Sequence, residues 1–365
     1  MHVHRPKRLS TVTVVIAAAL LLGACGSGAD SADTTAAATS PEDQVAQATK
    51  EGELLWYTAI STDASNAVIG AFEARYPGID VKLLRATTAD LWQRFQTENA
   101  ARNNVADVVN FADWGVIDSA KKAKLLAKYQ PSSVSDAIDA NVLDKQYVDG
   151  DGYYFASRVL DVAVVYNTDK VPADVAPKTW NDLADPWWGQ HGKLGILDPA
   201  RTATINAYWS MDKAGLAQPF FTGIAPHRPK IYDQGGAILN ALSSGEIDGG
   251  IITDYDAWGL IAKGQSPLAV VYPDAGVGAW TDYVGLAAQA PHPNAGRLFT
   301  EFLGSKEGSE AIAKAATVYV VRKDVPPYPA DKPPFTGLHV LPFDPAQVTA
   351  DRDAFLEKFN QWIGR

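Results

Sequence analysis

The chain has 365 residues, of which 47% are hydrophobic and 20% are charged. This is an ordinary globular composition, and the length is sufficient for two domains. The formal net charge is −10, and such an acidic chain argues against nucleic acid and against a basic membrane-binding surface. The single cysteine excludes a disulfide within the chain, so packing alone must hold the fold together.

The N-terminus carries the pattern of an export signal. A basic segment precedes an apolar stretch at 11–22, which is too short to span a bilayer comfortably. The sequence LGAC that ends at Cys25 resembles the lipobox of bacterial lipoproteins, whose cysteine is lipidated and becomes the new N-terminus. We therefore expect a signal peptide at 1–24 and a protein that is held outside the cytoplasm by a lipid on Cys25. The alternatives are an ordinary secretory signal and a single-span anchor.

A polar segment follows the cysteine. Residues 26–40 are all Gly, Ser, Ala, Asp or Thr, which cannot bury a core. We expect a flexible tether at 25–45. No second long apolar stretch follows it, so the rest of the chain is expected to work in the aqueous phase.

Strands and helices alternate in the first part of the body. The expected strands are 53–60, 79–85 and 106–111, and helices are expected after Ser61 and over 88–101. A β-α-β-α-β order with short loops predicts a parallel sheet covered by helices. Such sheets bind ligands at the carboxyl ends of their strands, which here are the loops that follow the first and third strands.

A second set of elements begins near Val162. The expected strands are 162–166, 193–197, 249–253, 268–272 and 283–288. One helix is expected to begin at Thr179, and a second to follow the loop 198–202 and extend through Trp209. Further helices are expected over 237–242, 294–303, 306–315 and 350–363. The chain is too long for one such sheet, so two sheets are expected.

Several segments, taken in order, resemble the extracytoplasmic solute-binding proteins of ABC importers, specifically the type II two-lobed class that includes the ferric-ion-binding proteins. The segments are LLWYTAIST, VAVVYNTDKVP, KTWNDLADPWWGQHGKLGILDP, SSGEIDGGIITDYDAW, VVYPDAGVGAW, NAGRLFTEFLGSKEGSEAIAKAATVYVVRKDV and FDPAQVTADRDAFLEKFNQW. Together the segments cover nearly all of the chain from residue 51 onward.

The resemblance implies an α/β fold of the periplasmic-binding-protein type II class. Each lobe would be a mixed sheet flanked by helices, and the ligand would lie in the cleft between the lobes. Lobe 1 would comprise 46–158 and 282–322, and lobe 2 would comprise 159–281 and 323–365. The chain would cross between them near 157–161 and again near 279–283. Closure of the lobes around ligand would be a hinge motion that the importer recognises.

Ferric ion is the first candidate ligand that the resemblance implies. The ferric-binding members hold iron with a histidine after the first strand, an acidic residue after the third, and two adjacent tyrosines. The matching positions here are Ser61, Ala112 or Asp113, Tyr255 and Asp256. Tyr255 and Asp256 are therefore the expected metal ligands, with iron as transported cargo and no cofactor.

An anionic solute is the second candidate. Ser61-Thr62 and Arg201-Thr202 each lie between an expected strand and an expected helix, where free backbone N–H groups favour an anion. Arg201 could add a charged hydrogen bond to a phosphate, phosphonate or carboxylate. The alternative is that these side chains only cap helices.

A cationic amine is the third candidate. Acidic and aromatic side chains together could hold it through ion pairs and cation–π contacts. The residues are Asp113, Trp114, Asp161, Tyr255, Asp256 and Trp280. The alternative is that the tryptophans pack in the core and that Asp161 belongs to the hinge.

The functional expectation is a substrate-binding lipoprotein of an ABC importer. It would capture ferric ion or a small phosphorylated, phosphonate or other polar organic solute, and deliver it as a monomer to permease and ATPase subunits. The sequence has no HExxH, GxSxG, P-loop or dinucleotide-binding motif, so no enzyme is expected. The alternatives are a ligand-sensing lipoprotein that signals to a membrane receptor and, less favoured, a secreted hydrolase.

Overall fold

The computed structural model describes residues 40–264 and 266–365. The expected signal peptide, Cys25 and most of the expected tether lie outside these residues. Within them, no helix combines the length and the hydropathy that crossing a membrane requires.

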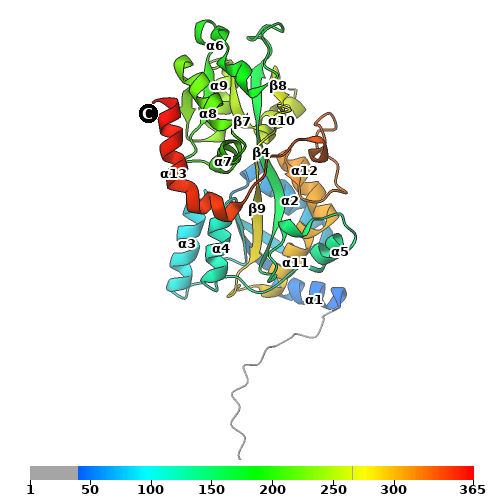
Figure 1. The fold of residues 1–365 in the computed structure, drawn as a ribbon. Helices are drawn as coiled ribbons and strands as arrows, with labels where there is room; N and C mark the ends of the chain where they lie inside the picture. The colour runs from blue at the N-terminus through cyan, green and yellow to red at the C-terminus, as the bar shows by residue number, and fades with distance from the viewer. Residues whose placement is uncertain (1–39, 265) are drawn as a thin grey trace, which may run out of the picture. The chain divides into compact units, whose positions relative to one another are not determined.

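The first sheet is parallel at one edge, as the sequence predicts. Its order is β2-β1-β3-β9-β4; β1 pairs parallel with β2 and β3, and β9 runs antiparallel to β3 and β4. Figure 1 shows β9 and β4 along the middle of the molecule. The short β10 pairs with the other edge of β4. The strands are β1 (Glu53–Thr58), β2 (Asp80–Arg85), β3 (Val108–Phe111), β4 (Tyr154–Asn167), β9 (Ala279–Leu286) and β10 (Tyr319–Val320).

The second sheet shares β4 with the first. From Val162 onward β4 pairs antiparallel with β7, and from Val164 also with β8. On the far side of β7 lie β5 and β6, both in parallel pairing. The additional strands are β5 (Leu194–Leu197), β6 (Lys230–Tyr232), β7 (Gly249–Thr253) and β8 (Leu268–Val271). We call the first sheet with its helices lobe 1 and the second lobe 2; β4 passes from one to the other at Asp161 and Val162.

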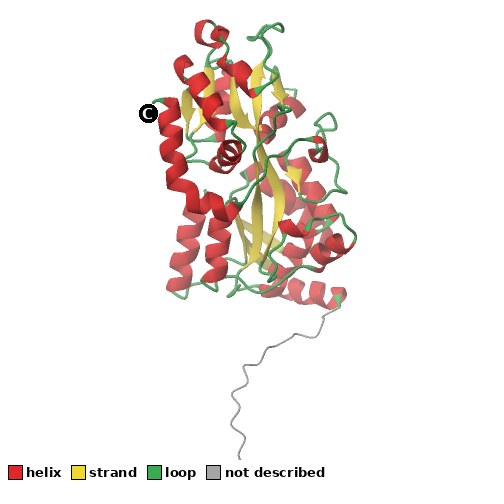
Figure 2. Cartoon of the chain, in the orientation of Figure 1, coloured by secondary structure: helices red, strands yellow, loops and turns green. Residues whose placement is uncertain are grey.

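Helices cover the sheets on both faces (Figure 2). In lobe 1, α3 and α4 contribute to the core on one face, and α2, α11 and α12 to the core on the other. The lobe 1 helices are α1 (Pro41–Glu51), α2 (Thr62–Arg75), α3 (Thr88–Ala100), α4 (Trp114–Lys122), α5 (Ser132–Asp139), α11 (Pro293–Gly304) and α12 (Lys306–Ala316). The lobe 2 helices are α6 (Pro186–Gln190), α7 (Ile205–Lys213), α8 (Ala217–Ile224), α9 (Gly235–Ser244) and α10 (Asp254–Ala262). Short 3₁₀ helices are Lys145–Tyr147, Trp180–Ala184, Ala225–His227 and Phe335–Gly337.

The starts of α1 and α13 lie several residues before the expected positions, and side-chain caps explain both. The expected tether runs to residue 45, whereas α1 begins at Pro41 because the Ser40 hydroxyl accepts a hydrogen bond from the Asp43 N–H. The last helix begins at Pro345 rather than at residue 350, because the Asp344 carboxylate accepts two first-turn N–H bonds. Proline at the first helical position suits both starts.

The C-terminal helix α13 (Pro345–Ile363) contacts both lobes. It packs against α4 in lobe 1 and against α7 and α8 in lobe 2 (Figure 1). Phe359 is buried with its ring centroid 5.0 Å from that of Phe221, and the Arg352 guanidinium donates to the Ala200 carbonyl at 3.4 Å. The assignment of 323–365 to lobe 2 stays a prediction, and α13 touches both lobes.

We predict that Phe359→Ala lowers the free energy of unfolding by about 3–5 kcal/mol, because it leaves a cavity between α13 and α8. Urea unfolding monitored by tryptophan fluorescence measures this loss. Phe359→Leu retains most of the volume and should lose much less. Equal losses for the two variants would contradict a packing role for α13.

Candidate functional site

A row of buried polar side chains crosses the lobe 1 sheet. Thr58 donates its hydroxyl hydrogen to Asn110 Oδ1 at 2.9 Å, and Asn110 Nδ2 donates to Asp282 Oδ1. Arg158 completes the row: its Nε donates to Asp282 Oδ2 at 2.6 Å, and its Nη2 is ion-paired with the same oxygen. All four side chains are buried, and Arg158 is only 4% exposed. Buried charges require partners of this kind, so the row fixes where the guanidinium lies.

A β-bulge in β4 brings Arg158 onto this face. Ala156 pairs with Tyr283, but Arg158 rather than Ser157 pairs with Asp282, so Ser157 is the extra residue. Side chains alternate along a strand, and without the bulge Arg158 would point to the opposite face. The bulge therefore places Arg158 beside Asp282, on the face that α2, α11 and α12 cover.

Arg158 lies close to two lobe 2 residues at the start of α10. α10 packs against β4, and the Arg158 charge favours the ionised forms of both Tyr255 and Asp256. Burial nevertheless dominates: it raises the pKa of Tyr255, and it raises the pKa of Asp256 to about 6 even though the Thr253 hydroxyl donates to Asp256 Oδ2 at 2.5 Å. Tyr255 is thus a neutral phenol at neutral pH.

Three helices begin near Arg158 and the start of the neighbouring lobe 2 segment, and none has a side-chain cap from the described residues. They are α2 after Ser61, α9 after Gln234 and α10 after Thr253. α9 and α10 start side by side, because a Cβ on Gly235 would lie 2.8 Å from Asp256 Oδ2. The start of α2 is joined to the polar row, since the Ile60 N–H donates to the Thr58 hydroxyl at 3.1 Å. Free N–H groups and helix dipoles favour negative charge at such ends.

The structure thus brings two groups of expected residues toward the same place. Ser61 and Thr62 are exposed at the start of α2 in lobe 1, and Tyr255 and Asp256 are half-buried at the start of α10 in lobe 2. The polar row, which ends at Arg158, lies between these two groups.

Arg201 and Thr202 lie in the loop after β5. Arg201 is exposed with its Nε 3.4 Å from Asp233 Oδ2, and Asp233 comes just before the start of α9. The Thr202 hydroxyl donates to the Asp198 carbonyl at 2.8 Å. Both residues are therefore on the lobe 2 side that carries α9 and α10, and their role as ligand contacts stays a prediction.

Asp113 and Trp114 have local partners at the start of α4. The Asp113 carboxylate accepts the Val116 N–H at 3.3 Å, as a helix cap does, and the Trp114 indole N–H donates to the Tyr154 hydroxyl at 3.0 Å. Trp114 packs with the lobe 1 core on the face opposite Arg158. These contacts account for both side chains, while a part in ligand binding stays a prediction.

Asp161 and Trp280 are buried at the junction of the lobes. Neither Asp161 oxygen has a hydrogen-bond partner among the described residues, and burial together with the Asp254 charge raises the pKa of Asp161 well above its usual range. Asp254 is itself paired with Lys332 Nζ at 2.7 Å. Trp280 is in the core, and its indole N–H lacks a partner in the same part of the chain. Contacts of these two residues with a ligand stay predictions.

The described residues contain no cluster of the side chains that usually bind metal ions. Among residues 40–264 and 266–365, no three His, Cys, Asp or Glu side chains are grouped so that they could hold a metal ion. Tyr255 and Asp256 as metal ligands remain a prediction from the sequence.

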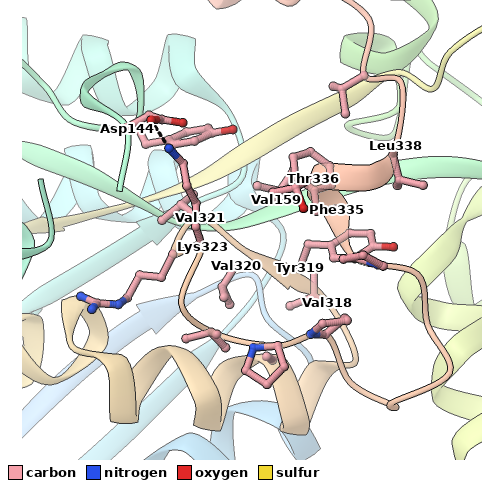
Figure 3. A pocket seen from close by; sticks show the side chains of 18 residues that line it. Asp144, Val159, Val318, Tyr319, Val320, Val321, Lys323, Phe335, Thr336 and Leu338 are labelled. Carbon is pink, nitrogen blue, oxygen red and sulfur yellow. Dashed lines mark hydrogen bonds and ion pairs between the residues drawn. The ribbon is translucent and has the colours of Figure 1, made fainter. Parts of the chain in front are cut away.

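A separate cavity of about 370 Å³ lies at the C-terminal segment (Figure 3). Val159 lines it, together with apolar residues such as Val318, Val321 and Phe335, and the Lys323–Asp144 ion pair lies at its side. Val159 points to the opposite face of β4 from Arg158, because neighbouring residues on a strand alternate. The cavity is therefore not part of the site around Arg158.

Comparisons with known proteins identify the family. Residues 67–336 match the family model described as bacterial extracellular solute-binding protein. Iron uptake protein A2 of Synechocystis is 25% identical over 267 residues, which cover 68% of this chain and 73% of that protein. The major ferric iron-binding protein of Neisseria meningitidis serogroup B is also 25% identical, over 276 residues that cover 74% and 81% of the two chains.

Solved structures share the fold. Iron-bound HitA from Pseudomonas aeruginosa superposes with a TM-score of 0.69 at 24% identity, over 85% of this chain and 99% of its own. AfuA from Actinobacillus pleuropneumoniae, with fructose-6-phosphate bound, also has a TM-score of 0.69, at 21% identity, over 86% and 99% of the two chains. The two-lobed α/β fold expected from the sequence is confirmed. The chain belongs to the bacterial extracellular solute-binding protein family.

Sequence reasoning missed the polar row. Arg158 stands in a strand whose other residues are mostly apolar, and a charged residue there was the available signal. Its partner Asp282 is far away in the sequence, and the bulge that aligns the two side chains has no sequence signature of its own.

We predict that Asp161→Asn raises the free energy of unfolding at pH 8. The pKa of Asp161 is raised in the folded state, so the folded carboxyl binds a proton more tightly than the unfolded one, whose pKa is about 4. The wild-type protein therefore loses stability as the pH rises above about 4, and the asparagine variant avoids that loss.

Urea unfolding between pH 4 and pH 8 measures the difference, which should shrink toward pH 4. Asp353→Asn, on an exposed part of α13, is the matched control and should give no such trend. An Asp161→Asn protein that is less stable than wild type at pH 8 would contradict the prediction.

Proposed function

We propose that this protein is the lipid-anchored solute-binding component of an ABC importer, and that it holds a small polar solute between its lobes. The site would lie where the starts of α2, α9 and α10 meet Arg158, Tyr255 and Asp256. The proposal rests above all on this meeting of groups from both lobes, since a cleft ligand must be held from both sides.

The comparisons support the importer and leave several ligand classes open. A partial relative from Sinorhizobium fredii, 31% identical over 126 residues, is named a probable ABC transporter periplasmic-binding protein. Four relatives have names that refer to iron, one structure of the same fold is iron-bound, and another carries a sugar phosphate. The candidate solutes are therefore ferric ion and a small phosphorylated, phosphonate or other polar organic compound.

Delivery requires a motion that the fold allows. β4 and β9 are the paired strands at the junction, and small backbone changes where β4 passes between the sheets would rotate one lobe against the other. A ligand that contacts both lobes stabilises the closed arrangement, and the permease would recognise that arrangement.

We predict that at least one ligand class raises the melting temperature of the purified protein. The panel is ferric ion with citrate, phosphate esters, phosphonates, amino acids and polyamines. A ligand at 100 times its dissociation constant adds about 2.7 kcal/mol to the free energy of unfolding, which is readily measured. A protein whose melting temperature responds to no member of the panel would contradict the proposal.

The ligand class then predicts which substitution weakens binding. A ferric ion response should be lost in Tyr255→Phe, because the phenolate is the expected iron ligand. A response to anions should be weakened by Arg201→Ala, and a response to amines by Asp256→Asn. Isothermal titration of each variant with the active compound measures the change. A variant that binds as wild type does excludes its residue from the site.

A further inference from the structure

Arg158 has hydrogen-bonding capacity that the protein does not use. A guanidinium is a fork of several N–H donors, and only Nε and Nη2 are engaged, both by Asp282. Nη1 has no hydrogen-bond partner among the described residues. It is also absent from the fully buried unpaired atoms of that part of the chain, so it keeps some exposure. A buried charged group with free donors at the meeting point of two lobes is available for a ligand.

Arg158 lies close to the start of α10 in lobe 2, because its charge acts on Tyr255 and Asp256. The bulge at Ser157 sets its direction, and Asp282, which Asn110 holds in turn, fixes its position. α10, which carries Tyr255 and Asp256, packs against β4. The unoccupied N–H groups at the starts of α2 and α10 add positive potential from either lobe.

We propose that Arg158 is the specificity-determining residue of the site, and that it binds the phosphate or carboxylate group of an organic anion. This inference rests on the proposed function and names its substrate class. The planar guanidinium would donate to the anion, while the helix starts complete the contacts from both lobes.

The charges around Arg158 argue against the two cationic candidates. Asp282 is paired with Arg158 and Asp254 with Lys332, so Asp256 is the carboxylate acting on Tyr255 that has no cationic partner among the described residues. A ferric ion or a polyamine would meet the unpaired N–H donors of Arg158 and the positive ends of the helices, with Asp256 as the carboxylate available to it. An anionic solute meets the guanidinium and the helix starts favourably.

Asp282 acts as a positioning residue in this scheme. It holds the guanidinium fork in one orientation, and it is held by Asn110 in turn. Removing Arg158 alone would leave the Asp282 charge buried without its partner, which typically destabilises a protein by about 3–5 kcal/mol. A useful test must therefore change both members of the pair.

The test compares Asp282→Asn with the double variant Arg158→Gln/Asp282→Asn. Both proteins lack the buried ion pair, and they differ only in whether the guanidinium is present. Arg75→Gln, at an exposed ion pair on α2, is the control for loss of one arginine. The full-length proteins in detergent are titrated calorimetrically with fructose 6-phosphate, inorganic phosphate, citrate, ferric ion with bicarbonate, and spermidine.

We expect at least one of the three anions to bind the wild type and the Arg75→Gln control with equal affinity, and to bind Asp282→Asn more weakly, because its guanidinium is less firmly oriented. The double variant should bind that anion at least about 100-fold more weakly, as expected for a charged hydrogen bond lost from a buried site. Circular dichroism verifies that each protein is folded before titration.

Two results would overturn the inference while the proposed function stands. One is an anion that binds the double variant as tightly as Asp282→Asn, and the other is a wild type that binds ferric ion or spermidine but no anion. A wild type that binds none of the five probes counts against this inference, while the broader panel above tests the proposed function separately.

Discussion

The ion pair between Arg158 and Asp282 is the constraint on which the rest of the site depends. A buried guanidinium and a buried carboxylate are stable only together, and only if further hydrogen bonds satisfy them. Here Asn110 and Thr58 extend the pair across four strands, β1, β3, β9 and β4. The row fixes the relative positions of these strands at the end of the sheet where α2 begins.

The same strand that carries Arg158 also carries the connection between the lobes. β4 pairs with β9 through Asp161 and with β7 from Val162 onward. The candidate site is therefore close to the point about which the lobes would move. A ligand that bridges Arg158 and the start of α10 would act on that point directly, without a relay through distant residues.

Most of the fold could be predicted from the sequence, because its strands are runs of β-branched and aromatic residues bounded by capping residues. The loops at Ser61 and Tyr255 could be predicted for the same reason, since ligands bind where strands end. The first half of β4 was missed because Arg158 and Asp161 interrupt the apolar pattern. The helix α1 was missed because its residues are mostly small and polar, and its buried side comes from packing, chiefly against α11.

The sharing of β4 has a consequence for how the protein loses its structure. One continuous strand supplies hydrogen bonds to both sheets, its first half to one and its second half to the other, and the fold must hold without a disulfide. We expect unfolding to be a single cooperative event rather than a stepwise loss of lobes. Outside the cell, where proteases attack partly opened chains, such all-or-none behaviour limits cleavage to the rare moments when the whole molecule is open.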